Sequence, residues 1–389
     1  MFRGGLHMFQ LLLAIIYLSF ISLGLPDALL GAAWPSIYPA FAVPVSWAGI
    51  ISMIIAAGTI VSSLQSDRMT RRLGTGKVTA LSVAATAVAL MGFSVSRSFA
   101  ALCLWAVPYG LGAGSVDAAL NHYVALHYES RHMSWLHCMW GLGASIGPYV
   151  MAWALAAGQS WSMGYRYIAF LQAALSAAIF LSLPLWKGRP HSGGVGEGKV
   201  LKLREVVAIP GARAVMLTFF CYCAMEQTAA LWASSYLVLH TGMETERAAG
   251  FGCLFYLGIT VGRALSGFLT MKLSDDRMVR LGQAVILGGL AALALPLGQA
   301  GALAGFVLVG LGCAPIYPCV IHSTPAHFGA ERSQAIIGVQ MASAYVGTCL
   351  APPVFGLLAQ YVSAALLPAY LGVLLGVMAL THRRLEAML

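Results

Sequence analysis

Four ionisable side chains lie inside long apolar stretches and are the residues best placed to do chemistry: Asp27, Asp117, Glu226 and Arg263. Only 9% of the 389 residues are charged, whereas 59% are hydrophobic. A charged residue at the centre of a membrane helix costs about 2.5 to 3.5 kcal/mol on insertion scales, so such residues usually face a watery cavity or one another. Anchoring a protein in a membrane does not require them, and we therefore interpret them as functional.

Asp117 and Asn121 are spaced four residues apart, which places both side chains on the same face of a helix. The acid can exchange a proton, and the amide can both donate and accept hydrogen bonds. This pair suits the recognition of a hydroxyl-rich solute. The alternative is a hydrogen bond between helices that only holds them together.

Asp27 follows Pro26 and lies between Gly24 and Gly31. A proline inside a helix leaves a backbone carbonyl without its partner, and glycines let a neighbouring helix approach closely. A carboxylate deprived of water binds a proton more readily. We predict that Asp27 carries a coupling proton, the alternative being an acid that bonds only to the interrupted helix backbone.

Glu226 and Arg263 lie in neighbouring apolar segments and have two interpretations. They line a solute path, with Glu226 also taking part in proton coupling, or they neutralise one another as a buried pair. Aromatic and amide groups near these acids would complete a pocket for a small molecule, because such pockets combine apolar walls with a few polar groups. Packing and interface anchoring are the alternative for any one of them. The candidates for solute contact are Asn121, His137, Trp140, Glu226, Trp232, Arg263, Tyr317, Gln340 and Tyr345.

Twelve apolar segments have to position these residues, and most approach the roughly 20 residues that a helix needs to cross a bilayer. They are 8–33, 44–65, 77–95, 98–124, 134–157, 164–186, 209–239, 247–271, 279–297, 300–323, 333–359 and 362–381. The fold class predicted is an all-α integral membrane protein. An even number of crossings puts both termini on one side, and the Lys and Arg residues gather on that side if it is the cytoplasm. We expect a plasma membrane protein, of the bacterial inner membrane, with both termini cytoplasmic.

A Gly-rich, basic stretch at 187–208 divides the chain into two halves, 1–186 and 209–389, with six segments each. Gly110-Leu111-Gly112 in the first half recurs as Gly310-Leu311-Gly312 in the second. Internal repeats around a midplane site are typical of secondary transporters. The sequence therefore predicts two pseudo-symmetric six-helix bundles joined by a cytoplasmic linker.

Other classes of function find little support. Residues 193–200 approach a phosphate-binding loop, but Val200 stands where Ser or Thr would hold magnesium, which disfavours ATP-driven transport. No catalytic motif and no metal-ligand spacing stands out, so we expect neither an enzyme nor a metal site, and no cofactor beyond the proton as coupling ion. The net charge of +9 reflects membrane topology and anionic lipid, and does not imply nucleic acid.

The loop after the second segment, Ser66-Asp67-Arg68-Met69-Thr70-Arg71-Arg72, resembles the Asp-Arg-x-Gly-Arg-Arg motif of the major facilitator superfamily. Twelve segments and a central linker extend this resemblance over essentially the whole chain. It implies a cytoplasmic gate formed by Asp67, Arg68, Arg71 and Arg72, with a counterpart at Asp276 and Arg277. Thr70 stands where the motif has glycine.

Within that superfamily the chain is most similar to the branch of fucose and glucose/galactose proton symporters. The likeness rests on Asp27, on the Gly-Leu-Gly motif followed by Asp117 and Asn121, and on His137. Further matching positions are Tyr222, Glu226, Trp232, Gly258, Gly262 and Arg263. The branch implies a proton carrier in the first segment and an acid in the fourth that couples the proton to sugar, which correspond to Asp27 and Asp117. Pro26 and Asp117 depart from the asparagine and glutamate that are usual there.

The sequence thus predicts proton-coupled symport of a sugar or a similar small polar solute, by alternating access, in a functional monomer. For a proton to drive such a cycle, the two conformations must bind it with different affinity. Three alternatives stay open: a proton-coupled multidrug or metabolite efflux antiporter, a lipid transporter, and a solute sensor that does not transport.

Overall fold

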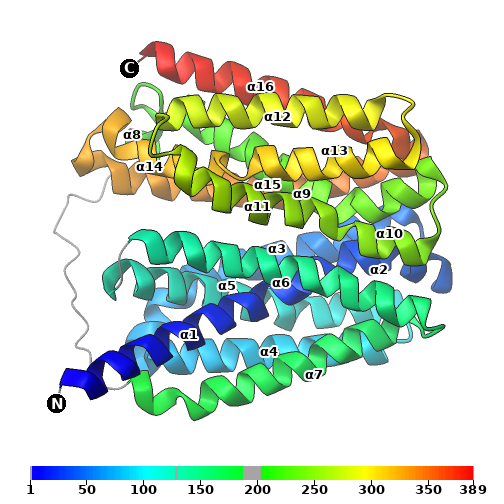
Figure 1. Ribbon diagram of the computed structural model, residues 1–389, viewed down its shortest axis with the longest axis horizontal. Helices are drawn as coiled ribbons and strands as arrows, with labels where there is room; N and C mark the ends of the chain where they lie inside the picture. The colour runs from blue at the N-terminus through cyan, green and yellow to red at the C-terminus, as the bar shows by residue number, and fades with distance from the viewer. Residues whose placement is uncertain (1, 128–129, 187–202, 389) are drawn as a thin grey trace. The chain divides into compact units, whose positions relative to one another are not determined.

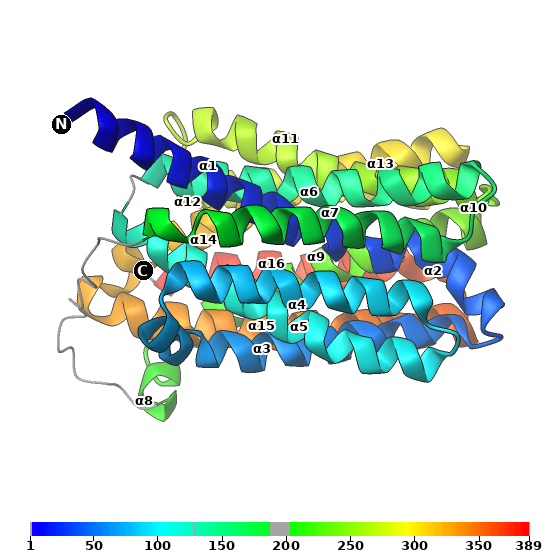
Figure 2. The same cartoon turned by 90° about the horizontal axis from the view of Figure 1, so that it is seen from below.

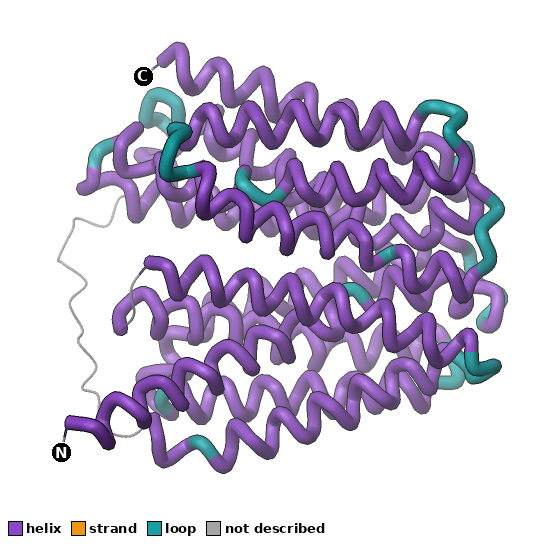
Figure 3. Tube along the Cα trace, viewed as in Figure 1, coloured by secondary structure: helices purple, strands orange, loops and turns teal. Residues whose placement is uncertain are grey.

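The computed structural model describes residues 2–127, 130–186 and 203–388, and over these residues the chain consists of helices and short loops (Figures 1 and 3). Contacts divide it into two compact units. The first unit comprises residues up to 190 together with Glu244–Cys253, and the second comprises the remainder.

The first unit contains seven helices from the first half of the chain that are longer than one turn. They are α1 (Phe2–Asp27), α2 (Leu29–Ala40), α3 (Ala48–Leu73), α4 (Thr75–Val95), α5 (Phe99–His127), α6 (Ser130–Ala156) and α7 (Trp161–Leu181). Helix α1 packs along α6, α3 along α5, and α4 along both α5 and α7 (Figure 2). A short helix from the second half, α10 (Thr245–Phe251), packs on α6 and α2 and so belongs to this unit.

The second unit is built in the same way from the remaining helices. They are α8 (Leu203–Val207), α9 (Ala212–Thr241), α11 (Cys253–Leu269), α12 (Asp275–Ala294), α13 (Gly298–Cys313), α14 (Ile316–Phe328), α15 (Ala330–Tyr361) and α16 (Leu367–Met388). Helix α9 packs against α15 and α16, and α12 packs against α13. Two features were not expected from the sequence: α8 forms within the predicted linker 187–208, and α10 contacts the first unit. The rest of that linker, 187–202, lies outside the described residues.

Eleven helices in the described chain are long and apolar enough to cross a membrane. They match eleven of the twelve predicted segments, and the all-α membrane class is confirmed. The predicted segment 134–157 corresponds to α6, which has 27 residues and packs along α1 but is not among the eleven. Its polar side chains and glycines lower its apolar content.

Matching glycines show that the two halves repeat one packing arrangement. A Cβ atom at Gly110 of α5 would overlap the carbonyl oxygen of Ile55 in α3, and a Cβ at Gly310 of α13 would overlap that of Phe255 in α11. The second glycine of each motif also lies against another helix backbone: Gly112 against Ser82, and Gly312 against Gly282. Only glycine allows helices to approach this closely. The repeated Gly-Leu-Gly motif therefore marks equivalent helix contacts in the two units.

Candidate functional site

Asp27 lies at a break between two helices that Pro26 helps to create. Helix α1 ends at Asp27 and α2 begins at Leu29, two residues later. Proline has no N–H, so the carbonyl four residues earlier, that of Ser22, has no partner within the helix. The buried side chain of Gln172 in α7 donates to that carbonyl oxygen instead, at 2.8 Å. The break is thus stabilised from a neighbouring helix, and Asp27 is left half-buried at its edge.

The Asp27 carboxylate accepts one hydrogen bond on each oxygen. The Tyr109 hydroxyl of α5 donates to Oδ1 at 2.8 Å, and the Trp140 indole N–H of α6 donates to Oδ2 at 2.8 Å. Both donors are neutral, so neither brings a positive charge to the acid. One carboxylate thereby joins three helices of the first unit.

Helix α6 brings Trp140 to Asp27 through direct contact between helix backbones. A Cβ atom at Gly24 of α1 would overlap the carbonyl oxygen of Trp140, and a Cβ at Gly143 of α6 would overlap that of Ile21. Larger residues at either glycine would hold the two helices apart. The two glycines therefore set the distance between Asp27 and its indole donor.

Asp117 and Asn121 form the pair that their spacing predicts. The Asn121 amide donates to Asp117 Oδ1 at 2.9 Å within α5. This hydrogen bond lies inside one helix, so it does not itself hold two helices together. Asp27 also acts electrostatically on Asp117, which places the two acids in one region of the first unit. The Asn121 amide oxygen is buried without a hydrogen-bond partner and is available to accept a bond from a solute hydroxyl.

In the second unit, Glu226 of α9 and Arg263 of α11 are brought into one region. Both are half-buried, and both act electrostatically on the Tyr222 hydroxyl and the Cys313 thiol. The Tyr222 hydroxyl is buried without a hydrogen-bond partner. This region holds one acid, one base and one hydroxyl that can still donate, which is enough to orient a polar ligand.

Two of the predicted solute contacts are instead occupied in helix packing. Trp232 is 1% exposed, and its indole N–H donates to the carbonyl oxygen of Pro352 at 2.9 Å. Gln340 is fully buried and pairs with Thr324, to which its amide donates at 3.1 Å. Their polar atoms already have partners inside the second unit, and we leave both out of the candidate site.

The remaining aromatic candidates have mixed surroundings. His137 is half-buried and meets the ring of Phe20 edge-on, with 5.7 Å between centroids. The Tyr317 hydroxyl contacts the Met341 sulfur at 3.5 Å. Tyr345 is half-buried on α15.

The predicted gate residues are placed only in part. The side chains of Asp67, Arg68 and Arg71 lie outside the described residues. Arg72 and Arg277 are exposed at the ends of their helices, while Asp276 faces histidines of the second unit.

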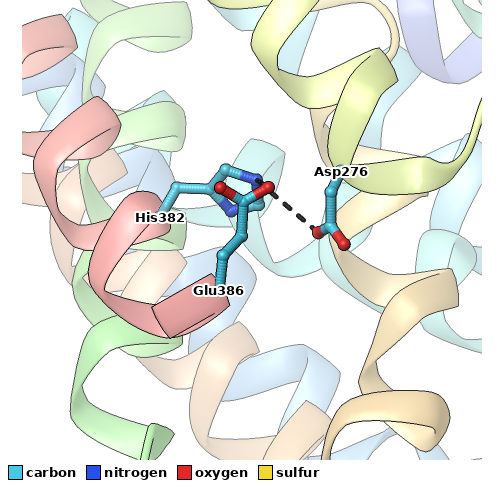
Figure 4. Close-up of side chains that lie close together, drawn as sticks. All are labelled: Asp276, His382 and Glu386. Carbon is cyan, nitrogen blue, oxygen red and sulfur yellow. Dashed lines mark ion pairs between the residues drawn. The ribbon is translucent and has the colours of Figure 1, made fainter. Parts of the chain in front are cut away.

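Sequence reasoning missed Tyr109 as a partner of Asp27, and it missed the cluster of Asp276, His382 and Glu386 (Figure 4). The four-residue spacing of His382 and Glu386 was a signal for the cluster, because it places both on one face of a helix. Tyr109 stood out only as one of several aromatic residues in the apolar segments, and the sequence does not pair it with Asp27.

The chain resembles known transporters over most of its length. The sequence profile described as Major Facilitator Superfamily matches residues 16–352. An uncharacterized transporter of Sinorhizobium fredii, y4wD, is 28% identical over 359 residues, which cover 86% of this chain and 88% of y4wD. The cis,cis-muconate transport protein of Acinetobacter baylyi is 21% identical over 289 residues, covering 70% of this chain and 68% of that protein.

Solved structures show the same fold. A mutant of the nucleoside transporter NupG superimposes with a TM-score of 0.76 at 12% identity, covering 96% of this chain and 98% of NupG. The human organic anion transporter MFSD10 (TETRAN) superimposes with a TM-score of 0.68 at 15% identity, with the same two coverages.

Proposed function

The chain belongs to the Major Facilitator Superfamily, and from this premise we propose that it is a proton-coupled transporter in which Asp27 carries the proton. It is an integral membrane protein that transports a small solute, and its relatives are transporters and not enzymes. The coupling ion and the solute class are our proposals.

The observation that carries the proposal is the surroundings of the Asp27 carboxylate. It lies at a helix break, and the two side chains that donate hydrogen bonds to it, Tyr109 and Trp140, are both neutral. An intramembrane acid held in this way is a typical element of a proton relay. The ionised form uses both donors, and the protonated form needs an acceptor for its own O–H.

The two donors give the proton a preferred position. An indole N–H can only donate, so a proton on the oxygen that faces Trp140 would meet another hydrogen. A hydroxyl can both donate and accept, so Tyr109 can turn and accept from a protonated Oδ1. We therefore place the coupling proton on the Asp27 oxygen that faces Tyr109, while Trp140 holds the other oxygen in both states.

Asp117 and Asn121 link the proton to the solute. Asp27 and Asp117 interact electrostatically, so neutralising one changes the field at the other. The amide oxygen of Asn121 offers an acceptor to a solute beside Asp117. We propose that a small hydroxyl-bearing solute, such as a sugar, binds there and that binding is thereby coupled to the proton.

A second candidate for the solute is an organic anion. Arg263 favours it, because a guanidinium binds carboxylates through two parallel hydrogen bonds and remains charged at any physiological pH. The similar proteins include a muconate transporter and an organic anion transporter, which is compatible with this candidate. Glu226 lies in the same region and would compete with the anion for Arg263.

The topology proposal rests on the distribution of basic residues. We propose that both termini lie in the cytoplasm, that the membrane is a bacterial inner membrane, and that the monomer is the functional unit. Labelling of single cysteines introduced near each terminus in intact cells would report the side, and labelling from outside would contradict the assignment.

Solute-induced proton movement in proteoliposomes tests the function. A pH-sensitive dye trapped in the lumen would be followed after external addition of a sugar, a nucleoside or a dicarboxylate, without an imposed gradient. Symport predicts acidification of the lumen with the transported solute, and antiport predicts alkalinisation. Solute uptake with no change in luminal pH would contradict proton coupling, and binding without uptake would indicate a sensor.

A further inference from the structure

A cluster of acids and histidines lies at one end of the second unit, where three helices begin or end. Asp276 belongs to the first turn of α12, His327 to the last turn of α14, and His382 and Glu386 to the last two turns of α16. Figure 4 shows His382 and Glu386 projecting from α16 toward Asp276. We propose that Asp276, His382 and Glu386 bind a divalent transition-metal ion of the Zn²⁺ type.

The ring nitrogens of His382 are buried without hydrogen-bond partners, which indicates a bound ligand. The His382 side chain is 2% exposed, and neither ring nitrogen has a hydrogen-bond partner. Asp276 Oδ1, which faces it, is also buried without a hydrogen-bond partner. Buried polar groups are almost always paired, and the binding of an ion is one of the few reasons for an exception. The His382 imidazole is a metal ligand when neutral, and the Asp276 carboxylate is one when ionised.

The separations between these atoms are close to those of ligands that share one ion. His382 Nε2 lies 3.6 Å from Asp276 Oδ1 and 3.9 Å from Glu386 Oε1, and the three ligand atoms all lie within 4.8 Å of one another. Hydrogen bonds of this type are shorter, about 2.7 to 3.2 Å. Zinc–ligand bonds of about 2.0 to 2.2 Å in a tetrahedral arrangement place two ligand atoms roughly 3.3 to 3.6 Å apart. A small shift of Glu386 completes that geometry.

The ligand types select the class of metal. Two carboxylates carry two negative charges, which a divalent ion neutralises, and an imidazole nitrogen favours Zn²⁺ and its neighbours over Mg²⁺ and Ca²⁺. His327 Nε2 lies 3.5 Å from the other oxygen of Asp276 and so helps to orient that carboxylate.

The surrounding charges do not occupy the site. Arg280 Nε lies 3.8 Å from Glu386 Oε1, but that side chain is 51% exposed and can turn into water. Asp275 is engaged elsewhere, since it pairs with His322 at 2.6 Å and interacts with Cys319. An ion at Asp276, His382 and Glu386 would tie α12 to α16 inside the second unit.

Cobalt binding to the full-length protein tests this inference. The protein would be purified, its affinity tag removed and bound metal stripped with a chelator, before titration with Co²⁺ and displacement by Zn²⁺. We expect one Co²⁺ per chain, with visible d–d bands and no thiolate charge-transfer band. Glu386→Gln and Asp276→Asn should weaken binding by roughly tenfold or more, since second-shell changes alone cost 10- to 100-fold.

Asp275→Asn is the matched control, because it removes the same charge from the same helical turn without removing a proposed ligand. It should bind Co²⁺ as the parent does, and Zn²⁺ should raise the melting temperature of the parent and of this control but not of Glu386→Gln. Melting of each variant without metal shows that it is folded. Equal binding by Glu386→Gln and the parent, a thiolate band, or no binding at all would overturn the site.

Discussion

Replacing Gly24 by alanine should disconnect Trp140 from Asp27. The added Cβ would overlap the Trp140 carbonyl oxygen, so α1 and α6 must separate by about 1 Å or more to reach ordinary van der Waals contact. The indole N–H now lies 2.8 Å from Asp27 Oδ2, and this separation would carry it beyond hydrogen-bonding distance.

The magnitude follows from the bond that is lost. A hydrogen bond to a charged group contributes about 1.5 to 3 kcal/mol, which corresponds to roughly a 10- to 100-fold change in the equilibrium that depends on it. If the helices stay together instead, overpacking costs about 1 to 3 kcal/mol of stability. Gly24→Ala should therefore lower both the melting temperature and the rate of proton-coupled uptake.

Gly288→Ala provides the matched control. A Cβ at this position in α12 would meet nothing within 4 Å, so the same change only improves helix propensity and should stabilise the protein by up to about 1 kcal/mol. Thermal unfolding in detergent and uptake in proteoliposomes would be measured for both variants. If Gly24→Ala proves as stable and as active as Gly288→Ala, the contact between α1 and α6 does not position the indole as argued.

Three further variants test individual side chains. Trp232→Phe leaves the Pro352 carbonyl without its donor and should lower the free energy of unfolding by about 1 to 3 kcal/mol, with unchanged solute affinity. Weaker solute binding at unchanged stability would show instead that Trp232 contacts the solute. Asn121→Ala removes the free amide oxygen and should weaken solute binding roughly tenfold, as measured by ligand-induced thermal stabilisation. Unaltered affinity would show that Asn121 does not contact the solute. Gln172→Leu deprives the Ser22 carbonyl of its donor and should lower the melting temperature, and a fully stable variant would show that the helix break needs no such support.

The sequence was sufficient to predict the helices and the helix break at Asp27. The lengths of the apolar segments located the crossings. Pro26 beside Asp27 indicated a broken helix, and the carbonyl that the proline leaves without a partner accepts a hydrogen bond from Gln172. The repeated Gly-Leu-Gly motif indicated the duplicated packing, because a glycine at a helix contact has few substitutes.

The partners of individual side chains were less predictable. Trp140 and Trp232 are the same residue type in similar apolar segments, yet one donates to Asp27 and the other to a backbone carbonyl. Likewise, Asp276 and His382 lie far apart in the sequence and meet only because α12 begins where α16 ends. These outcomes depend on which helix faces which, and helical periodicity in one sequence does not specify that.

The most direct test of proton carriage compares Asp27→Asn with the parent in proteoliposomes, using two assays of the same transported solute. The amide keeps the shape of the side chain but cannot exchange a proton. If Asp27 carries the proton, solute counterflow between the two sides persists, while accumulation driven by a pH gradient and the accompanying change in luminal pH are both lost. Accumulation by Asp27→Asn equal to that of the parent, with the same proton movement per solute, would contradict it.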